Sequence, residues 1–204
     1  MPSDRIDGCT GVLVAGGRAA RLGGIPKGLL RLEGETIAAR ALRLFGSLFP
    51  AALVVANDPA PYRQLGVAVV ADRIAGKGAP GGVHAAMHAA ATEWIFAAAC
   101  DMPFLEAGPI RLLAAHRRPG VAAVLVRFGG VLQPLHALWS RECLPVLERM
   151  LAAGDPSLME LARAVSAHVV EEREWRTVDP AGRALENANT PEDAARLGLT
   201  SYQL

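Results

Sequence analysis

The sequence predicts an α/β protein in which a mostly parallel β-sheet is covered by helices on both faces. Three observations support this fold class. Short apolar runs typical of buried strands alternate with segments of helical length along the chain. Glycine-rich or polar segments follow several of these runs. Hydrophobic residues make up 51% of the 204 residues, which is enough for one sizeable core. We therefore expect a single domain over residues 1–204.

Six apolar runs are predicted to be strands, because each is short, rich in aliphatic residues and followed by polar or turn-forming residues. They comprise residues 11–15, 51–56, 67–71, 94–100, 121–127 and 168–171. Pro103 ends the fourth run, since proline cannot donate to a strand ladder. Gly129-Gly130 predicts a turn after the fifth run.

Helices are predicted between these strands. Thr36 has the position of an N-cap for a helix that runs to about Gly46 and carries its apolar residues on one face. Further helices are predicted over residues 83–91, 109–116, 144–152 and 158–165. Near the C-terminus, Asn189 or Thr190 followed by Pro191 predicts the start of a last helix.

Composition excludes several function classes. The formal net charge is +1, so the chain has no general attraction for DNA, RNA or anionic lipid. Its three cysteines are widely spaced and predict reduced thiols rather than a disulfide framework. The sequence begins without the apolar region of a signal peptide and contains no run of about 20 apolar residues. We expect a cytoplasmic protein that binds neither nucleic acid nor membrane.

A glycine-rich basic segment directly follows the first predicted strand. Val14, Ala15, Gly16 and Gly17 begin it, and consecutive backbone N–H groups there can cradle phosphate oxygens. Further along, Arg21 and Lys27 can place positive charge on those oxygens. The segment is not a Walker A motif, because the residue after Lys27 is glycine rather than serine or threonine. The alternative is an ordinary basic surface loop.

Asp101 ends the fourth predicted strand and is a candidate magnesium ligand. Parallel strands carry their ligands at their carboxyl ends, so Asp101 is expected beside the phosphate segment. Mg²⁺ prefers one or two carboxylates together with substrate phosphates. Asn187 and Asn189 are further candidates near this metal, although part of their segment also forms a helix cap. The alternative for Asp101 is a turn-forming residue before Met102-Pro103.

Asn57 and Asp72 follow the second and third predicted strands. An amide offers both a donor and an acceptor, as a nucleobase edge requires, and a carboxylate accepts from a base or from ribose hydroxyls. Simple turn chemistry explains these residues equally well.

Two other patterns imitate known sites. Gly76 to Gly81 matches the G-x-G-x-x-G pattern of dinucleotide-binding proteins, but it follows the third strand and contains Pro80. His84 and His88 lie four residues apart in a predicted helix, which is a spacing that metal-binding pairs use. No third ligand is evident in the sequence, so we expect two neighbouring histidines without a metal.

The residues together resemble the molybdenum cofactor guanylyltransferases, over about residues 11–197. The opening signature of that family is similar to Leu13-Val14-Ala15-Gly16-Gly17, Arg21-Leu22-Gly23-Gly24 and Pro26-Lys27-Gly28-Leu29. Later segments follow in the family's order. They are Asn57, Asp72 before Gly78-Ala79-Pro80-Gly81-Gly82, Cys100-Asp101-Met102-Pro103, Gln133-Pro134-Leu135 to Trp139, and Asn187-Ala188-Asn189-Thr190-Pro191-Glu192-Asp193.

This resemblance implies a Rossmann-like three-layer α/β/α sandwich of the nucleotide-diphospho-sugar transferase type. It implies transfer of GMP from GTP to molybdenum-molybdopterin with release of pyrophosphate. In the family, the backbone of residues 14–16 and the residues matching Lys27, Asn57, Asp72 and Asp101 bind GTP, and the residue matching Asp101 also holds Mg²⁺. The implied partners are GTP, the molybdopterin-type cofactor and, transiently, a molybdoenzyme or a cofactor-delivery protein.

The chain departs from the family pattern at two places. Pro26 stands where the guanylyl enzymes usually have aspartate, and Ala79-Pro80 replaces their usual Pro-Leu. A cytidylyltransferase, a sugar-phosphate nucleotidyltransferase and a non-catalytic GTP-binding assembly factor therefore stay as alternatives. Because the acceptor phosphate is already an anion, we expect catalysis by positioning and charge neutralisation, with Lys27, Arg21 and Asp101 as the catalytic residues.

Overall fold

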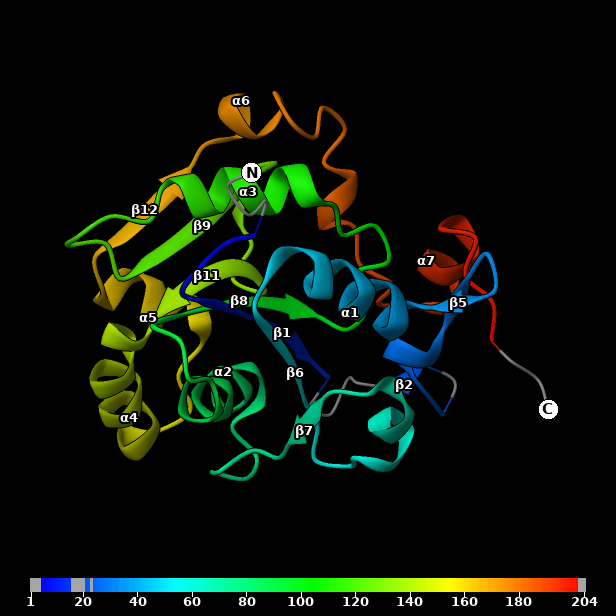
Figure 1. The fold of residues 1–204 in the computed structure, drawn as a ribbon, viewed down its shortest axis with the longest axis horizontal. Helices are drawn as coiled ribbons and strands as arrows, with labels where there is room; N and C mark the ends of the chain where they lie inside the picture. The colour runs from blue at the N-terminus through cyan, green and yellow to red at the C-terminus, as the bar shows by residue number, and fades with distance from the viewer. Residues whose placement is uncertain (1–4, 16–20, 23, 202–204) are drawn as a thin grey trace.

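The computed structural model describes residues 5–15, 21–22 and 24–201. An eight-stranded sheet lies at the centre, with the strand order β10-β9-β11-β8-β1-β6-β7 and with β12 paired to β9 (Figure 1). Its strands are β1 Cys9–Val14, β6 Ala51–Val55, β7 Ala68–Val70, β8 Trp94–Ala99, β9 Ala123–Phe128, β10 Val131–Leu132, β11 His136–Ser140 and β12 Ala167–Val170.

The half of the sheet that bears on function is parallel. Strand β1 pairs in parallel with both β6 and β8, and β6 pairs in parallel with β7. The chain therefore runs outward from β1 in one direction through β6 and β7, and then returns to the other side of β1 as β8. Ligands of open α/β sheets bind at such a switch point, outside the carboxyl ends of the strands.

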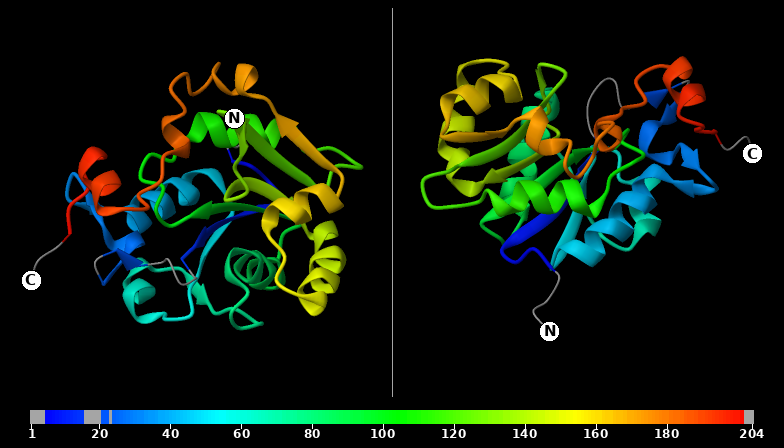
Figure 2. Two further views of the ribbon diagram at one scale, coloured as in Figure 1. Left: turned by 180° about the vertical axis from the view of Figure 1, so that it is seen from behind. Right: turned by 90° about the horizontal axis from the view of Figure 1, so that it is seen from above.

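Helices cover both faces of the sheet, as expected. The helices of the described residues are α1 Ile37–Leu48, α2 Gly78–Ala89, α3 Ala107–Ala115, α4 Leu144–Ala153, α5 Leu158–Ala164, α6 Glu172–Trp175 and α7 Pro191–Arg196. One core cluster packs α1 and α3 against the sheet, and a second packs α2, α4 and α5 against the opposite face. Figure 2 shows the resulting three layers from behind and from above. The predicted fold class is confirmed.

Short elements connect the layers. The two-stranded hairpins are β2–β3, Arg21–Leu22 with Ile25–Pro26, and β4–β5, Arg31–Leu32 with Glu35–Thr36. The 3-10 turns are η1 Lys27–Leu29, η2 Ala60–Leu65, η3 Arg141–Cys143 and η4 Arg183–Leu185.

The predicted helix starts and turns follow local chemistry. The Thr36 side chain accepts from the Ala39 N–H at 3.1 Å and caps α1. Of the two candidates for the last cap, Thr190 is the N-cap of α7 and forms a capping box with Asp193. Gly129 and Gly130, with φ of 58° and 77°, join β9 to β10 as the predicted turn.

Helix α2 begins five residues earlier than predicted, at Gly78 rather than at Val83. The glycines and Pro80 indicated a loop, but Pro80 falls in the first helical turn. The N–H groups there have no partner within the helix, so proline costs little. Part of the predicted glycine-rich loop is therefore the beginning of a helix.

Strand β11 is absent from the sequence-based prediction and lies between β8 and β9. It pairs antiparallel with both neighbours, so the sheet is parallel only in part. Its residues His136–Ser140 are all buried. A five-residue stretch without alternation carries too little pattern to identify it as a strand.

The C-terminal segment returns to the start of the chain. A third core cluster joins α7 to the β4–β5 region, and Arg31 forms an isolated bridge with Thr200. Cys9, Cys100 and Cys143 are buried and free, as the spacing predicted. Among the described residues, the helices are each too short or too polar to cross a membrane.

Candidate active site

The carboxyl ends of four parallel strands meet at one edge of the sheet. Val14 ends β1, and Asn57, Asp72 and Asp101 each follow within two residues of the ends of β6, β7 and β8. Two backbone hydrogen bonds fix this edge: the Cys100 N–H donates to the Val14 carbonyl at 3.1 Å, and the Ala15 N–H donates to the Val55 carbonyl at 2.8 Å. The candidate residues predicted from separate strands are thus brought to one edge.

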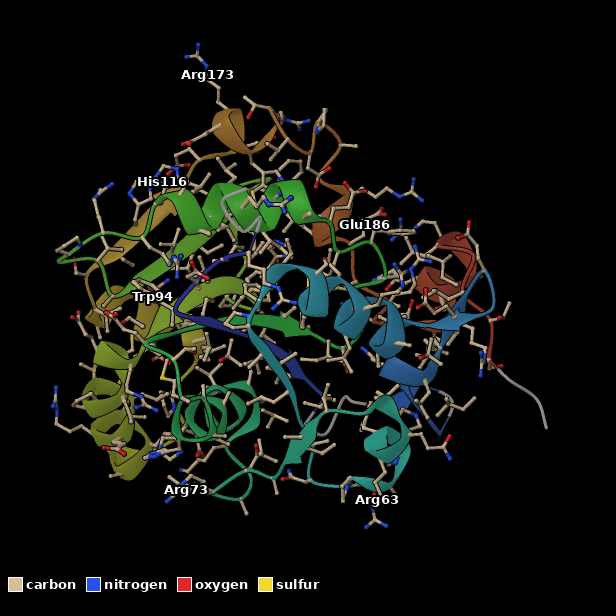
Figure 3. The ribbon with its side chains drawn as sticks, in the orientation of Figure 1. Arg63, Arg73, Trp94, His116, Arg173 and Glu186 are labelled. Carbon is tan, nitrogen blue, oxygen red and sulfur yellow. The ribbon has the colours of Figure 1, made fainter. Side chains whose placement is uncertain are left out.

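Lys27 is a buried cation at this edge, with only 4% of its surface exposed. Its ammonium group donates to Asp101 Oδ2 at 3.0 Å and to Asn189 Oδ1 at 2.9 Å. A buried charge is tolerated only when it is paired and hydrogen-bonded, and these two contacts supply both. Lys27 therefore places a buried positive charge directly beside Asp101. Arg63 and Arg73, by contrast, extend outward from the surface (Figure 3).

The local backbone holds Lys27 in this place. Pro26 precedes η1 with a φ of −56°, close to the value that its ring imposes. A Cβ on Gly28 would lie 3.2 Å from the hydroxyl of Tyr62 and 3.4 Å from Cβ of Cys100. Only glycine lets η1 sit against these neighbours without displacement. Pro26, which departs from the family pattern, therefore fits the backbone that precedes the lysine.

Asn57 and Asp72 form a reciprocal pair across neighbouring strand ends. Asn57 Nδ2 donates to Asp72 Oδ2 at 2.8 Å, and the Asp72 N–H donates to Asn57 Oδ1 at 2.9 Å. The other carboxylate oxygen, Asp72 Oδ1, is buried and has no hydrogen-bond partner among the described residues. A buried acceptor without a donor is costly, so this oxygen is available to an N–H or O–H group of a ligand.

The first turn of α2 packs closely behind this pair. A Cβ on Gly82 would lie 3.0 Å from Cγ1 of Val14, and one on Gly81 would lie 3.8 Å from Cγ of Asp72 and 2.9 Å from Cβ of Lys77, just before the helix. These glycines let the helix N-terminus approach the ends of β1 and β7. Its unpaired N–H groups and dipole favour an anion at this position.

Asn187 and Asn189 lie next to Asp101 because the chain between them is attached to it. The Ala188 N–H donates to the backbone carbonyl of Asp101 at 2.9 Å. A pocket of about 240 Å³ opens beside them. It is lined by Ala99, Asp101, Met102, Gln133, Pro134, Leu135, Asn187 and Asn189. Sequence reasoning named the two asparagines and Asp101, but it gave no role to Met102.

Some predicted site residues are only partly described. Gly16 and Gly17 lie outside the described residues, and only the backbone of Arg21 is described, in β2. Val14 and Ala15 have the predicted position. Because the Val14 carbonyl and the Ala15 N–H already serve the sheet, a nucleotide would have to contact other atoms of these two residues.

The residues fit a hard divalent cation. Asp101 Oδ2 and Asn189 Oδ1 bind the Lys27 ammonium, so a divalent cation beside it would take the other carboxylate oxygen of Asp101, with Asn187 lining the same pocket. Carboxylate and amide oxygens together with phosphates are the ligand set that Mg²⁺ takes in nucleotide sites.

Two other patterns have different outcomes. Gly76 to Gly81 covers the end of the connection from β7 to α2 and the first turn of α2. The pattern therefore follows β7, whereas a dinucleotide-binding fingerprint would follow the first strand, β1. The histidine pair has a third neighbour that the sequence did not make evident: Glu148 of α4 approaches both His84 and His88. Sequence spacing could not reveal this contact, because Glu148 lies on a different helix.

Comparisons with known proteins agree with this geometry. A family model described as the MobA-like NTP transferase domain matches residues 11–171. The chain is 32% identical over 183 residues to a molybdenum cofactor guanylyltransferase of Syntrophotalea carbinolica, covering 89% of this chain and 87% of that protein. It is 36% identical over 203 residues to a probable molybdenum cofactor guanylyltransferase of Chloroflexus aggregans, covering 94% and 96%.

Solved structures support the fold. The structure of molybdopterin-guanine dinucleotide biosynthesis protein A from Archaeoglobus fulgidus is similar with a TM-score of 0.79 at 23% identity, covering 93% of this chain and 96% of that one. A 2-C-methyl-D-erythritol 4-phosphate cytidylyltransferase from Thermus thermophilus is similar with a TM-score of 0.61 at 18% identity, covering 91% and 95%. The shared architecture is therefore one that nucleotidyltransferases use.

Proposed function

The chain belongs to the family of MobA-like NTP transferases and is a nucleotidyltransferase, and we propose that it transfers GMP from GTP to molybdenum-molybdopterin. Pyrophosphate is the leaving group, and the guanine dinucleotide form of the cofactor is the product. The observation that carries the proposal is the buried Lys27 ammonium, paired with Asp101 and Asn189 at the switch point of the sheet.

Asn57 and Asp72 are proposed to bind the nucleoside part of GTP. The unpartnered Asp72 Oδ1 needs a donor, and guanine offers N–H donors on its Watson–Crick edge. Asn57 holds the carboxylate in place through its Nδ2. Replacing Asn57 by Ala should therefore weaken the binding of GTP more than the binding of other nucleotides.

The phosphates are proposed to lie between residues 14–17, Lys27 and Asp101. Asp101, with Asn189 or Asn187, would hold Mg²⁺, which neutralises charge on the phosphate groups when it is bound. Lys27 supplies a preorganised positive charge where negative charge develops on the α-phosphate and on the leaving pyrophosphate. Arg21 is proposed to assist it. The acceptor phosphate is already anionic and needs no general base, so the site mainly orients the two reactants.

The pocket lined by Gln133, Met102 and Asn187 is proposed to receive the acceptor. It adjoins Asp101 on the side away from the Asn57–Asp72 pair, so an acceptor phosphate there and a nucleotide on the other side would meet at Asp101.

We also propose that residues 1–204 act as one cytoplasmic domain, with a molybdoenzyme or a cofactor-delivery protein as a transient partner.

Pyrophosphate release measured with GTP, Mg²⁺ and molybdenum-loaded molybdopterin tests this function. We expect turnover with GTP, loss of turnover in Asp101→Asn, and normal turnover in Asp7→Asn, which changes the same residue type before the opposite end of β1. Turnover with CTP alone would leave a nucleotidyltransferase of different specificity. GTP binding without pyrophosphate release would favour the assembly factor, and full activity in Asp101→Asn would refute the role of that carboxylate.

A further inference from the structure

His84, His88 and Glu148 form a cluster between helices α2 and α4. His84 and His88 lie on one face of α2, one helical turn apart, with ring centroids 4.6 Å from each other. Glu148 reaches them from α4, which packs beside α2 on the same face of the sheet. The cluster lies along the helices, whereas Lys27 and Asp101 lie at the strand ends.

The ligand-type atoms of this cluster converge. His88 Nε2 lies 3.1 Å and His84 Nε2 lies 3.6 Å from Glu148 Oε1, and one such atom from each residue lies within 4.8 Å of the others. In a tetrahedral zinc site with bonds of about 2.0–2.1 Å, neighbouring ligand atoms stand about 3.4 Å apart. The two distances to Glu148 bracket that value, so modest side-chain adjustment would allow all three atoms to bind one ion.

His84 adds a second, independent observation. The residue is 4% exposed, and its Nδ1 is buried without a hydrogen-bond partner among the described residues. Its Nε2 faces the Glu148 carboxylate at 3.6 Å, which is longer than a normal hydrogen bond. The atom that this buried imidazole presents to the other two side chains is therefore Nε2, which lies too far from Glu148 for a normal hydrogen bond, while its Nδ1 is buried on its own.

The chemistry of the set selects the kind of ion. Two imidazoles and one carboxylate suit Zn²⁺ and related first-row metals, whereas Mg²⁺ and Ca²⁺ prefer sites made of oxygen atoms. The His88 and Glu148 side chains are 27% and 49% exposed, so an ion can enter from solvent and keep water as a fourth ligand. We propose that His84, His88 and Glu148 bind one Zn²⁺-class ion that links α2 to α4, separate from the magnesium proposed at Asp101.

Such an ion would brace the helix whose first turn supports the nucleotide site. Helix α2 starts at Gly78, and His84 lies less than two turns further along it. Lys77, just before the helix, also binds Asp155 after α4 at 2.6 Å. The proposed ion and this ion pair would hold the two helices together at two levels.

Zinc titration of the metal-free protein against a chromophoric chelator, in excess Mg²⁺ to occupy oxygen sites, tests the proposal. We expect one equivalent of Zn²⁺ on the natural protein, and an affinity at least tenfold lower in Glu148→Gln and in His88→Ala. His116→Ala is the matched control: His116 also binds a glutamate, Glu174 at 2.8 Å, but it directly follows α3, on the opposite face of the sheet (Figure 3). It should bind Zn²⁺ normally.

Melting temperatures give a second measurement. Metal-free Glu148→Gln should melt close to the natural protein, because its side chain keeps the same shape and is partly exposed. Zn²⁺ should raise the melting temperature of the natural protein and of His116→Ala, but not that of Glu148→Gln. Absence of stoichiometric Zn²⁺ binding, or equal affinity in the natural protein, Glu148→Gln and His88→Ala, would overturn the proposal.

Discussion

His136 gives the molecule a pH-dependent stability that can be calculated from its surroundings. It lies in β11, fully buried, between the rings of Phe96 and Trp175 at centroid distances of 5.1 and 5.3 Å. Neither ring nitrogen has a hydrogen-bond partner among the described residues. Burial lowers the pKa of His136 from 6.5 to about 3, although Asp179 acts in the opposite direction. The native state therefore holds this imidazole neutral.

The sign and size of the effect follow from linkage. Below pH 6.5 the unfolded chain protonates His136 while the native state does not, so the free energy of unfolding decreases as the pH falls towards 3. Each pH unit in this window costs about 1.4 kcal/mol from this residue. Between pH 7 and pH 5 the native state should lose about 2 kcal/mol through His136 alone.

Urea denaturation of the natural protein and of His136→Phe, at pH 7 and at pH 5, measures this contribution. Phenylalanine fills a similar space among the aromatic rings and cannot be protonated, whereas all other titrating groups are shared by both proteins. The variant should lose about 2 kcal/mol less than the natural protein between the two pH values. Its stability at pH 7 should not fall, because two unsatisfied nitrogens are removed. An equal pH dependence in both proteins would refute the reasoning.

Three other predictions concern the site and the core. Lys27→Ala should lower kcat/KM by roughly 100-fold or more, because it removes a positive charge that faces the reacting phosphates. Steady-state kinetics with GTP measure this change, and a loss of less than about threefold would disprove the role of Lys27. Gly82→Ala should destabilise by about 1–3 kcal/mol, because its Cβ would lie 3.0 Å from Val14 Cγ1. The control Gly46→Ala, in α1 with no atom within 4 Å, should stabilise by up to about 1 kcal/mol, and chemical denaturation should separate the two. Burial raises the pKa of Cys9, Cys100 and Cys143 to about 12, so a thiol reagent should modify none of them in the native state at neutral pH and all three in urea; rapid native labelling would contradict their burial.

The sequence predicted those features that depend on local chemistry. Buried apolar runs marked β1, β6 and β8, and the Thr36 and Thr190 caps marked two helix starts within a residue. Because the carboxyl ends of parallel strands share one edge, the positions of Asn57, Asp72 and Asp101 could also be predicted to meet there. The spacing of apolar residues, the capping residues and the common direction of the parallel strands are enough to predict these features.

Features that depend on distant contacts could not be predicted in this way. Strand β11 lies between β8 and β9 and pairs with both. Its position in the sheet depends on these two strands, and its own five residues carry no pattern that indicates it. The hydrogen bond between Lys27 and Asn189 joins residues 162 positions apart. The contact of Glu148 with the two histidines depends on how α4 packs against α2. No local pattern encodes the distance between such pairs.

The contact between Lys27 and Asn189 makes the C-terminal segment a part of the site. A lysine as buried as Lys27 requires both its carboxylate and its amide partner, since an uncompensated buried charge costs several kcal/mol. Asn189 is held by the Ala188–Asp101 hydrogen bond, by the capping box at Thr190 and by the core cluster that packs α7 on β4. Burial of the apolar residues of α7 therefore stabilises the position of Asn189, and through it the position of the Lys27 ammonium. Substitutions in that cluster should therefore disturb the position of Lys27 in the proposed phosphate site, although the substituted residues do not bind Lys27 themselves.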